Sequence, residues 1–128
     1  MIVKILLGCA VYAAVSFNAF GQEEDKKGGV SYQNDVYPIL HDYCLSCHSP
    51  GGRGYNKSGL DMNSYETLMK GTRFGAVVKA GDPETSTVVM LVEGRARPEL
   101  HMPPLNGKLY REHITILRKW VHQGARNN

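Results

Sequence analysis

This sequence is short, carries little net charge and contains no internal repeat. The 128 residues carry a formal net charge of only +3, and they contain no nucleic-acid-binding motif. A groove that binds a nucleic-acid backbone needs many more basic side chains, so this function is excluded. The chain is also too short for a Rossmann enzyme with a substrate domain or for a TIM barrel. We therefore expect one small domain.

Apolar residues are scarce once the first segment of the chain is set aside. Residues 1–21 hold 16 hydrophobic residues and a single charged one, Lys4. The other 107 residues contain 44 apolar residues when Gly is counted and Tyr is not. That share, about 41%, is slightly below the ~45–50% of globular domains. A small domain with a thin core usually needs a disulfide, a metal, a partner or a cofactor to be stable.

The first segment is typical of a secretory signal peptide. Lys4 gives a short basic start, and an apolar run follows from Ile5 to Phe17. Ala19 and Gly21 then place small residues at the two positions that signal peptidase requires. The apolar run is short for a membrane span, so an uncleaved anchor helix is the less favoured alternative. The sequence predicts a signal peptide over residues 1–21.

Two further predictions follow for the N-terminal part of the chain. Cys9 ends a stretch that resembles a lipoprotein signal, which makes a lipid anchor at Cys9 a second, less favoured alternative. We expect residues 22–30 to form a polar, flexible N-terminus and residues 31–126 to form the working domain. Each alternative takes the domain across a membrane, so we expect it in the periplasm or another extracytoplasmic space, with no stable membrane span in the mature chain.

Cysteine is rare, and its placement is informative. Besides Cys9, the chain has two cysteines, in the motif Cys44-Leu45-Ser46-Cys47-His48. Cys-x-x-Cys-His is the attachment signature of c-type haem. Two thiols three residues apart can both form thioethers on one side of a porphyrin, and the next residue then donates an imidazole nitrogen to the iron. The sequence predicts one covalent haem c held by Cys44, Cys47 and His48.

Three other interpretations of the motif stay open but are less favoured. A disulfide between Cys44 and Cys47 would close a loop too small to stabilise the fold much. A thioredoxin-type dithiol needs a βαβ setting, and no buried strand precedes Cys44. A zinc site would use Cys44, Cys47, His48 and a distant histidine, but a second Cys/His pair is missing and adjacent ligands fit zinc poorly.

Capping and periodicity predict an all-α fold of short helices joined by Gly/Pro-rich loops. If the first helix starts at Ser31, Pro38 should kink it, whereas a start at Asn34 leaves Pro38 in the first turn. The prolines of 94–107 predict that this segment contains no helix. The predicted helices run from Ser31 or Asn34 to Tyr43, from a cap at Asn63 to just before Gly71, from Ser86 to Glu93, and from Leu109 or Tyr110 to Gln123.

The second iron ligand is predicted in the proline-stiffened segment His101-Met102-Pro103-Pro104. Two prolines after Met102 restrict the backbone, so its thioether can be held against iron at little ordering cost. We expect His48 and Met102 to be the metal ligands, with His101 as the rival of Met102. Six-coordinate iron leaves no position for substrate, and no acid–base or nucleophile constellation is present, so we expect no catalytic residues and no enzyme activity. The other methionines and histidines (Met62, Met69, Met90, His41, His113 and His122) are expected to be core or surface residues.

These features together resemble the monohaem c-type cytochromes, and in particular the planctomycete-type cytochrome c domain. The resemblance implies a cytochrome c fold in which Cys44 and Cys47 anchor the haem and His48 and Met102 ligate its iron. It also implies that the first and last helices cross near the haem, with Val36 and Leu40 against Leu117 and Trp120. One departure is Tyr110, where the family usually has a Ser or Thr cap. The resemblance rests on Val36-x-Pro38-Ile39-Leu40, the haem motif, Gly59-Leu60-Asp61-Met62, Gly81-Asp82-Pro83-Glu84-x-Ser86, Met102-Pro103-Pro104, Leu109 and Trp120-Val121-x-x-Gly124-Ala125.

The function expected from this set is one-electron transport by an extracytoplasmic, monomeric carrier that exchanges electrons with redox proteins. Two alternatives use the same motif. One is a ligand-sensing or peroxidase-like domain whose distal site opens, and the other is an electron-accepting module docked on a dehydrogenase. Three pairs of basic residues could contact a partner protein or the haem propionates, or could simply be exposed to solvent. They are Lys26-Lys27, Arg95/Arg97 and Arg118-Lys119.

Overall fold

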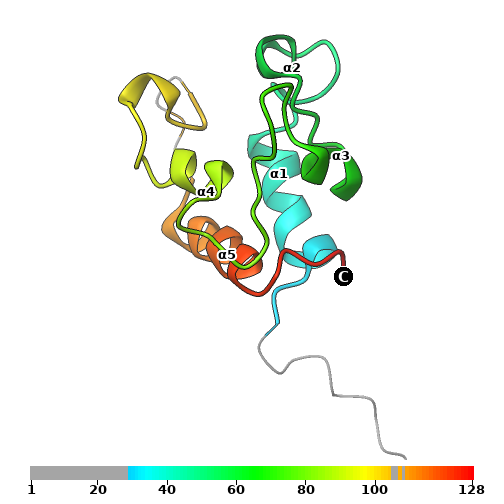
Figure 1. Ribbon diagram of the computed structural model, residues 1–128, viewed down its shortest axis with the longest axis vertical. Helices are drawn as coiled ribbons and strands as arrows, with labels where there is room; N and C mark the ends of the chain where they lie inside the picture. Colours follow the sequence, from blue (N-terminus) through cyan, green and yellow to red (C-terminus); the bar gives the residue numbers. More distant parts are fainter. Residues whose placement is uncertain (1–28, 105–106, 108) are drawn as a thin grey trace, which may run out of the picture.

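The computed structural model describes residues 29–104, 107 and 109–128, and within them the chain is helical (Figure 1). These residues form no β-strand; the nearest feature is an isolated bridge between Thr72 and Gly75. The predicted all-α fold is therefore confirmed. The helices in chain order are η1 (Tyr32–Val36, π-helical), α1 (Tyr37–Tyr43), α2 (Arg53–Ser58), α3 (Tyr65–Lys70), α4 (Thr87–Val92), η2 (Pro98–Leu100, a 3-10 turn) and α5 (Arg111–His122).

Predictions for the N-terminal segment fall on residues that the structure does not describe. They concern the signal peptide at residues 1–21, the lipid-anchor alternative at Cys9 and the pair Lys26-Lys27, and they stay predictions. Among the helices described, none is both long enough and apolar enough to cross a membrane.

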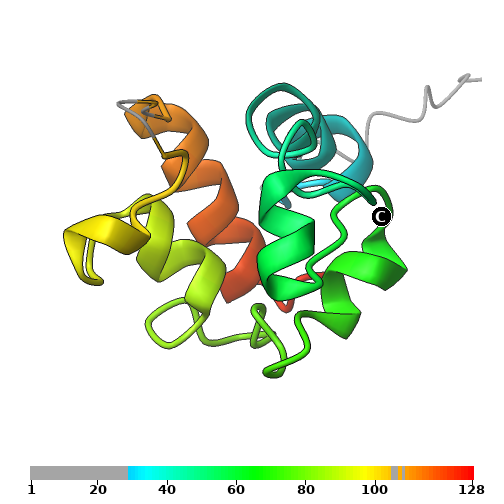
Figure 2. The same cartoon turned by 90° about the horizontal axis from the view of Figure 1, so that it is seen from above.

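The helices fall into two groups when the molecule is viewed from above (Figure 2). α4, η2 and α5 lie on one side, and α1, α2 and α3 lie on the other. The first and last helices join the two groups, because the Tyr32 ring of η1 lies 5.6 Å from the Trp120 ring of α5, measured between centroids. Val36, Leu40 and Leu117 are buried in the same core. The contact between first and last helices that the family resemblance implies is therefore present.

The first helix begins at Ser31, whose side chain accepts a hydrogen bond from the Asn34 backbone N–H at 3.1 Å. Pro38 then falls inside the helical run, where it offers no N–H and would crowd a regular turn. The chain adopts a wider π turn just before it, in which the Tyr37 N–H bonds to the Tyr32 carbonyl oxygen. A start at Ser31 thus goes with a π turn ahead of Pro38, which then lies in the first turn of α1.

The helix at 65–70 starts one residue later than predicted. Its cap is Ser64, not Asn63: the Ser64 hydroxyl accepts from the Thr67 N–H at 3.1 Å, and the Thr67 hydroxyl accepts from the Ser64 N–H at 3.2 Å. Such a reciprocal pair satisfies two donors at once. Asn63 is used in the preceding turn, where its N–H donates to the Asp61 carboxylate at 3.0 Å.

The two later helices agree with their predicted positions. Ser86 caps α4, and its buried hydroxyl donates to the Asp82 carbonyl oxygen and accepts from the Lys79 N–H, both at 2.8 Å. Ser86 thus fixes the turn that leads into the helix. α5 starts after Tyr110, which provides no side-chain cap bond, as its departure from the family pattern suggests.

Two short helices were missed. α2 lies in the segment expected to be a loop, and η2 lies in the proline-rich segment expected to contain no helix. α2 depends on a contact from outside itself, since its Tyr55 N–H donates to the Cys47 carbonyl oxygen at 2.9 Å. In η2, Pro98 occupies the first position, where a missing N–H costs nothing.

Candidate functional site

A cavity of about 350 Å³ is lined by residues of both groups of helices. Its volume is within the roughly 300–1,000 Å³ of small-molecule and cofactor sites. The residues that line it come from 43–62 and 87–104, with Thr72 and Val77 between them in the chain. Its wall is mainly aliphatic, as cofactor pockets usually are: Leu60, Met62, Val77, Val88, Leu91 and Val92.

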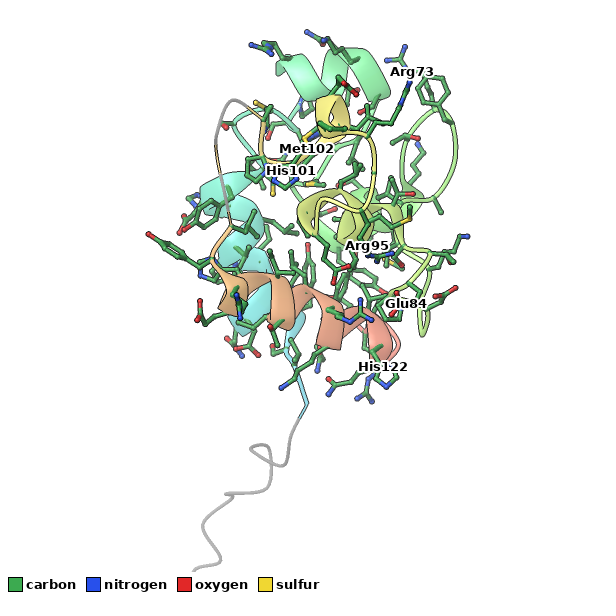
Figure 3. All side chains as sticks on the ribbon, turned by 90° about the vertical axis from the view of Figure 1, so that its left-hand side faces the viewer. Arg73, Glu84, Arg95, His101, Met102 and His122 are labelled. Atoms are coloured by element: carbon green, nitrogen blue, oxygen red, sulfur yellow. The ribbon has the colours of Figure 1, made fainter. Side chains whose placement is uncertain are left out.

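All four residues predicted to hold the haem line this one cavity. Cys44, Cys47 and His48 lie on the turn that follows α1. Met102 reaches the cavity from the segment that follows η2, more than fifty positions further along the chain (Figure 3). Sequence reasoning thus found residues that the fold brings together from two distant segments.

The two cysteines lie on a tight turn that continues α1. The Cys47 and His48 N–H groups both bond to the Cys44 carbonyl oxygen, at 3.1 and 2.9 Å. Both thiols are free. Burial, with a smaller effect from Cys47, raises the pKa of Cys44 to about 12. A thiol with so high a pKa stays protonated, whereas the nucleophile of a thioredoxin-type dithiol has a lowered pKa. The dithiol alternative therefore gains no support.

The His48 imidazole is half-buried and lines the cavity. Its Nδ1 atom is buried and has no hydrogen-bond partner among the described residues. Burial lowers the pKa of His48, and a weaker interaction with the Leu60 backbone, which does not reach hydrogen-bond geometry, opposes that change. The ring is thus kept neutral, which is the form that binds a metal.

Helix α2 holds the His48 ring by packing its backbone against it. A Cβ atom placed on Gly54 would lie 2.6 to 2.9 Å from three atoms of the imidazole, so only glycine fits there. On the other side of the turn, the Met62 N–H donates to the His48 carbonyl oxygen at 2.8 Å. Gly54 was not singled out in the sequence, because its φ is ordinary and its requirement comes from this contact alone.

Met102 and its rival His101 have different positions. Met102 lines the cavity and is anchored by its N–H, which donates to the Leu91 carbonyl oxygen at 3.3 Å. His101 is not among the lining residues. Its imidazole lies beside Gly94, with Nδ1 3.3 Å from the position of a Cβ at Gly94 (Figure 3). The geometry favours Met102.

Residues 44–106 match the family model described as Planctomycete cytochrome C. The chain contains a cytochrome c-like domain. It is therefore a haem-binding cytochrome, as its sequence motif indicates. No curated protein and no solved structure matches the chain.

The residues of this cytochrome fit a haem. The cavity wall is aliphatic, and two thiols, a half-buried imidazole and a methionine line the same space. No group of three or more His, Cys, Asp and Glu residues that could hold a metal ion occurs in the part of the chain that the structure describes, so the zinc alternative gains no support.

The remaining histidines of the cytochrome lie away from the cavity. His41 pairs with Asp42 at 2.9 Å, and His122 is exposed on α5 (Figure 3). His113 makes a tilted ring contact with Tyr43 and an edge-on contact with Tyr110, at 5.2 and 5.6 Å between centroids. None of the three lines the cavity.

Two of the basic residues suggested as docking or propionate contacts are already engaged. Arg118 pairs with Glu84 and, at 3.0 Å, with Glu93. Arg95 pairs with Glu93 and donates to the Glu84 carbonyl oxygen at 2.8 Å (Figure 3). These contacts tie α4, α5 and the turn before α4 together. The basic residues that do line the cavity, Arg53 and Lys57, were missed; their place five to ten positions after the haem motif was the available signal.

Proposed function

We propose that this cytochrome is an extracytoplasmic one-electron carrier with a single covalent haem c and His/Met ligation. The observation that carries the proposal is that Cys44, Cys47, His48 and Met102 line one apolar cavity from two sides. The bound group supplies a one-electron iron couple, and the chain supplies its position, its ligands and its dry surroundings.

Each site residue has a stated role in this proposal. Cys44 and Cys47 would hold the haem through thioether bonds, each formed by addition of an S–H across one vinyl group. His48 would ligate the iron through an imidazole nitrogen, and α2 holds the ring in place through Gly54. Met102 would supply its thioether sulfur as the second ligand, and a methionine ligand raises the potential relative to histidine.

The wall of the cavity supports a carrier rather than an enzyme. Leu60, Val77, Val88 and Val92 exclude water from the centre of the site. The charged residues that line the cavity are Arg53, Lys57 and Glu99, which provide no paired carboxylates for acid–base work. We propose that the protein has no catalytic residues and that its partners are redox proteins.

An extracytoplasmic location completes the proposal. It is supported by the signal-peptide pattern of residues 1–21 and by the chemistry of the motif, since covalent attachment of haem c takes place outside the bacterial cytoplasm. Cleavage after Gly21 would be found by N-terminal sequencing of the exported protein.

The test uses the full chain expressed in cells that carry a cytochrome c maturation system. A pyridine haemochrome spectrum should show one covalently attached haem per chain, and its absence would overturn the proposal. Carbon monoxide should bind the reduced protein slowly and incompletely at neutral pH. Fast, complete binding would instead favour the ligand-sensing alternative.

Ligation by Met102 is tested with a matched pair of methionine variants. Met102→Ala should lose the sulfur-to-iron charge-transfer band of the oxidised protein, because that band requires a methionine ligand. Met90→Ala should keep it, since Met90 is on α4 and does not line the cavity. A band that survives in Met102→Ala would show that another residue ligates the iron.

A further inference from the structure

The charged residues around the cavity are unevenly placed. Arg53 and Lys57 line it from α2, and Glu99 lines it from η2. No other charged residue in the described part of the chain is among those that line the cavity. One part of the rim is thus positive and another part is negative.

Helix α2 presents its two basic side chains as a pair. Arg53 and Lys57 are four residues apart, one turn of helix, so both lie on the same face. Within the described residues neither side chain forms an ion pair or a side-chain hydrogen bond. This differs from Arg95 and Arg118, which are both paired with Glu93.

The neighbourhood of α2 strengthens the positive side. Arg73 donates from Nη2 to the Asn56 carbonyl oxygen at 2.9 Å, which brings a third cation to this helix (Figure 3). Residues 50–60 and 67–81 contain no Asp or Glu. A group with two carboxylates would be attracted to this side of the cavity and repelled from Glu99.

We propose that Arg53 and Lys57 bind the two propionate carboxylates of the haem, so that the carboxylate edge lies on α2 and away from Glu99. The inference rests on the proposed function, because it presupposes the haem. It replaces Arg95 and Arg118, which the sequence suggested for this role. The guanidinium of Arg53 suits a bidentate bond to one carboxylate, and the ammonium of Lys57 provides a point charge for the other.

The pair has a measurable effect on the redox equilibrium. Reduction adds one negative charge at the iron, so a nearby positive charge stabilises the reduced form. Removal of one such charge should favour the oxidised form by roughly three- to tenfold in the equilibrium constant at low salt. A tenfold change corresponds to about 59 mV for a one-electron couple.

The experiment compares midpoint potentials of the full haem-loaded protein at low and high salt. Arg53→Gln and Lys57→Gln should each lower the potential, and the difference should shrink as salt is added. Arg53→Lys and Lys57→Arg keep the charge and should restore most of the potential. Glu99→Gln should raise it. The control is Arg97→Gln, which removes an exposed charge that does not line the cavity and should change the potential little.

A second readout tests contact rather than charge alone. The propionate bending modes in the resonance Raman spectrum should shift in Arg53→Gln and Lys57→Gln, because these modes respond to hydrogen bonds at the carboxylates. Unshifted modes, or potentials equal to that of Arg97→Gln, would overturn the inference while the haemochrome spectrum still supports a covalent haem. A wild-type protein without covalent haem would instead overturn the proposed function itself.

Discussion

The contact between Gly54 and His48 can be tested by adding one methyl group. Gly54 lies inside α2, and a Cβ there would lie 2.6 Å from Cε1, 2.8 Å from Nε2 and 2.9 Å from Nδ1 of His48. Carbon atoms in proteins pack favourably at about 3.5–4.0 Å. In Gly54→Ala the ring or the helix must therefore move by several tenths of an ångström.

Two opposing effects set the size of the change. Replacing glycine by alanine within a helix stabilises it by about 1 kcal/mol. Inserting a methyl group into a packed contact usually costs about 1–3 kcal/mol. The clash involves three ring atoms, and the neighbouring N–H of Tyr55 is bonded to Cys47, so α2 has little freedom to withdraw. We expect the overpacking to exceed the helix gain, with a net loss of up to about 2 kcal/mol.

The assay is urea unfolding of the haem-loaded protein, followed by the haem absorbance. Gly54→Ala should lower the urea midpoint and perturb the ligand-field region of the spectrum, because the displaced ring is the proposed iron ligand. Gly29→Ala is the control, since its Cβ would meet nothing within 4 Å. If Gly54→Ala is more stable than the wild type and has an unchanged spectrum, α2 does not hold the histidine and the reasoning fails.

Two further predictions concern the fold away from the cavity. Ser64→Ala should destabilise the protein by about 1 kcal/mol in urea unfolding, because it removes the cap of α3. Asn63→Ala should destabilise it clearly less, and the reverse order would show that Asn63 is the cap. Burial raises the pKa of Tyr32 from 10.0 to about 12, with smaller effects from Tyr37, Glu66 and Tyr65. Between pH 10 and 12 the Tyr32 hydroxyl therefore ionises in the unfolded chain but not in the folded protein, so the free energy of unfolding should fall as the pH rises. The fall should amount to about 2–3 kcal/mol. Tyr32→Phe should abolish it without loss of stability at pH 7, because the buried hydroxyl has no hydrogen-bond partner among the described residues. An equal alkaline fall in both proteins would contradict this.

Local patterns were enough to predict most of the helices and the residues that line the cavity from the haem motif and from Met102. The predicted helix positions at the start of the domain and over 86–93 and 109–123 rest on caps and apolar periodicity, which act within a few residues. Cys44, Cys47 and His48 were found because their chemistry requires fixed spacing. Met102 was found because two prolines follow it, and it lines the same cavity.

The features that were missed depend on contacts between distant segments. α2 is held by Cys47 and by the His48 ring, and neither contact leaves a helix signal in residues 53–58. The engagement of Arg95 and Arg118 by Glu84 and Glu93 also requires the packing of α4 against α5. Spacing along the chain says nothing about such pairs, so these basic residues and the pair on α2 could not be told apart in the sequence.

The shortage of apolar residues can be assigned to a place in the fold. The first and last helices pack on each other through Tyr32 and Trp120, and that part of the core is complete without a cofactor. Elsewhere in the core, the buried side chains of Met62 and Val88 line the cavity. A haem in this position would supply the apolar surface that the sequence itself lacks. The residues that ligate the iron in our proposal therefore also hold together the two groups of helices, which links the stability of the domain to its redox site.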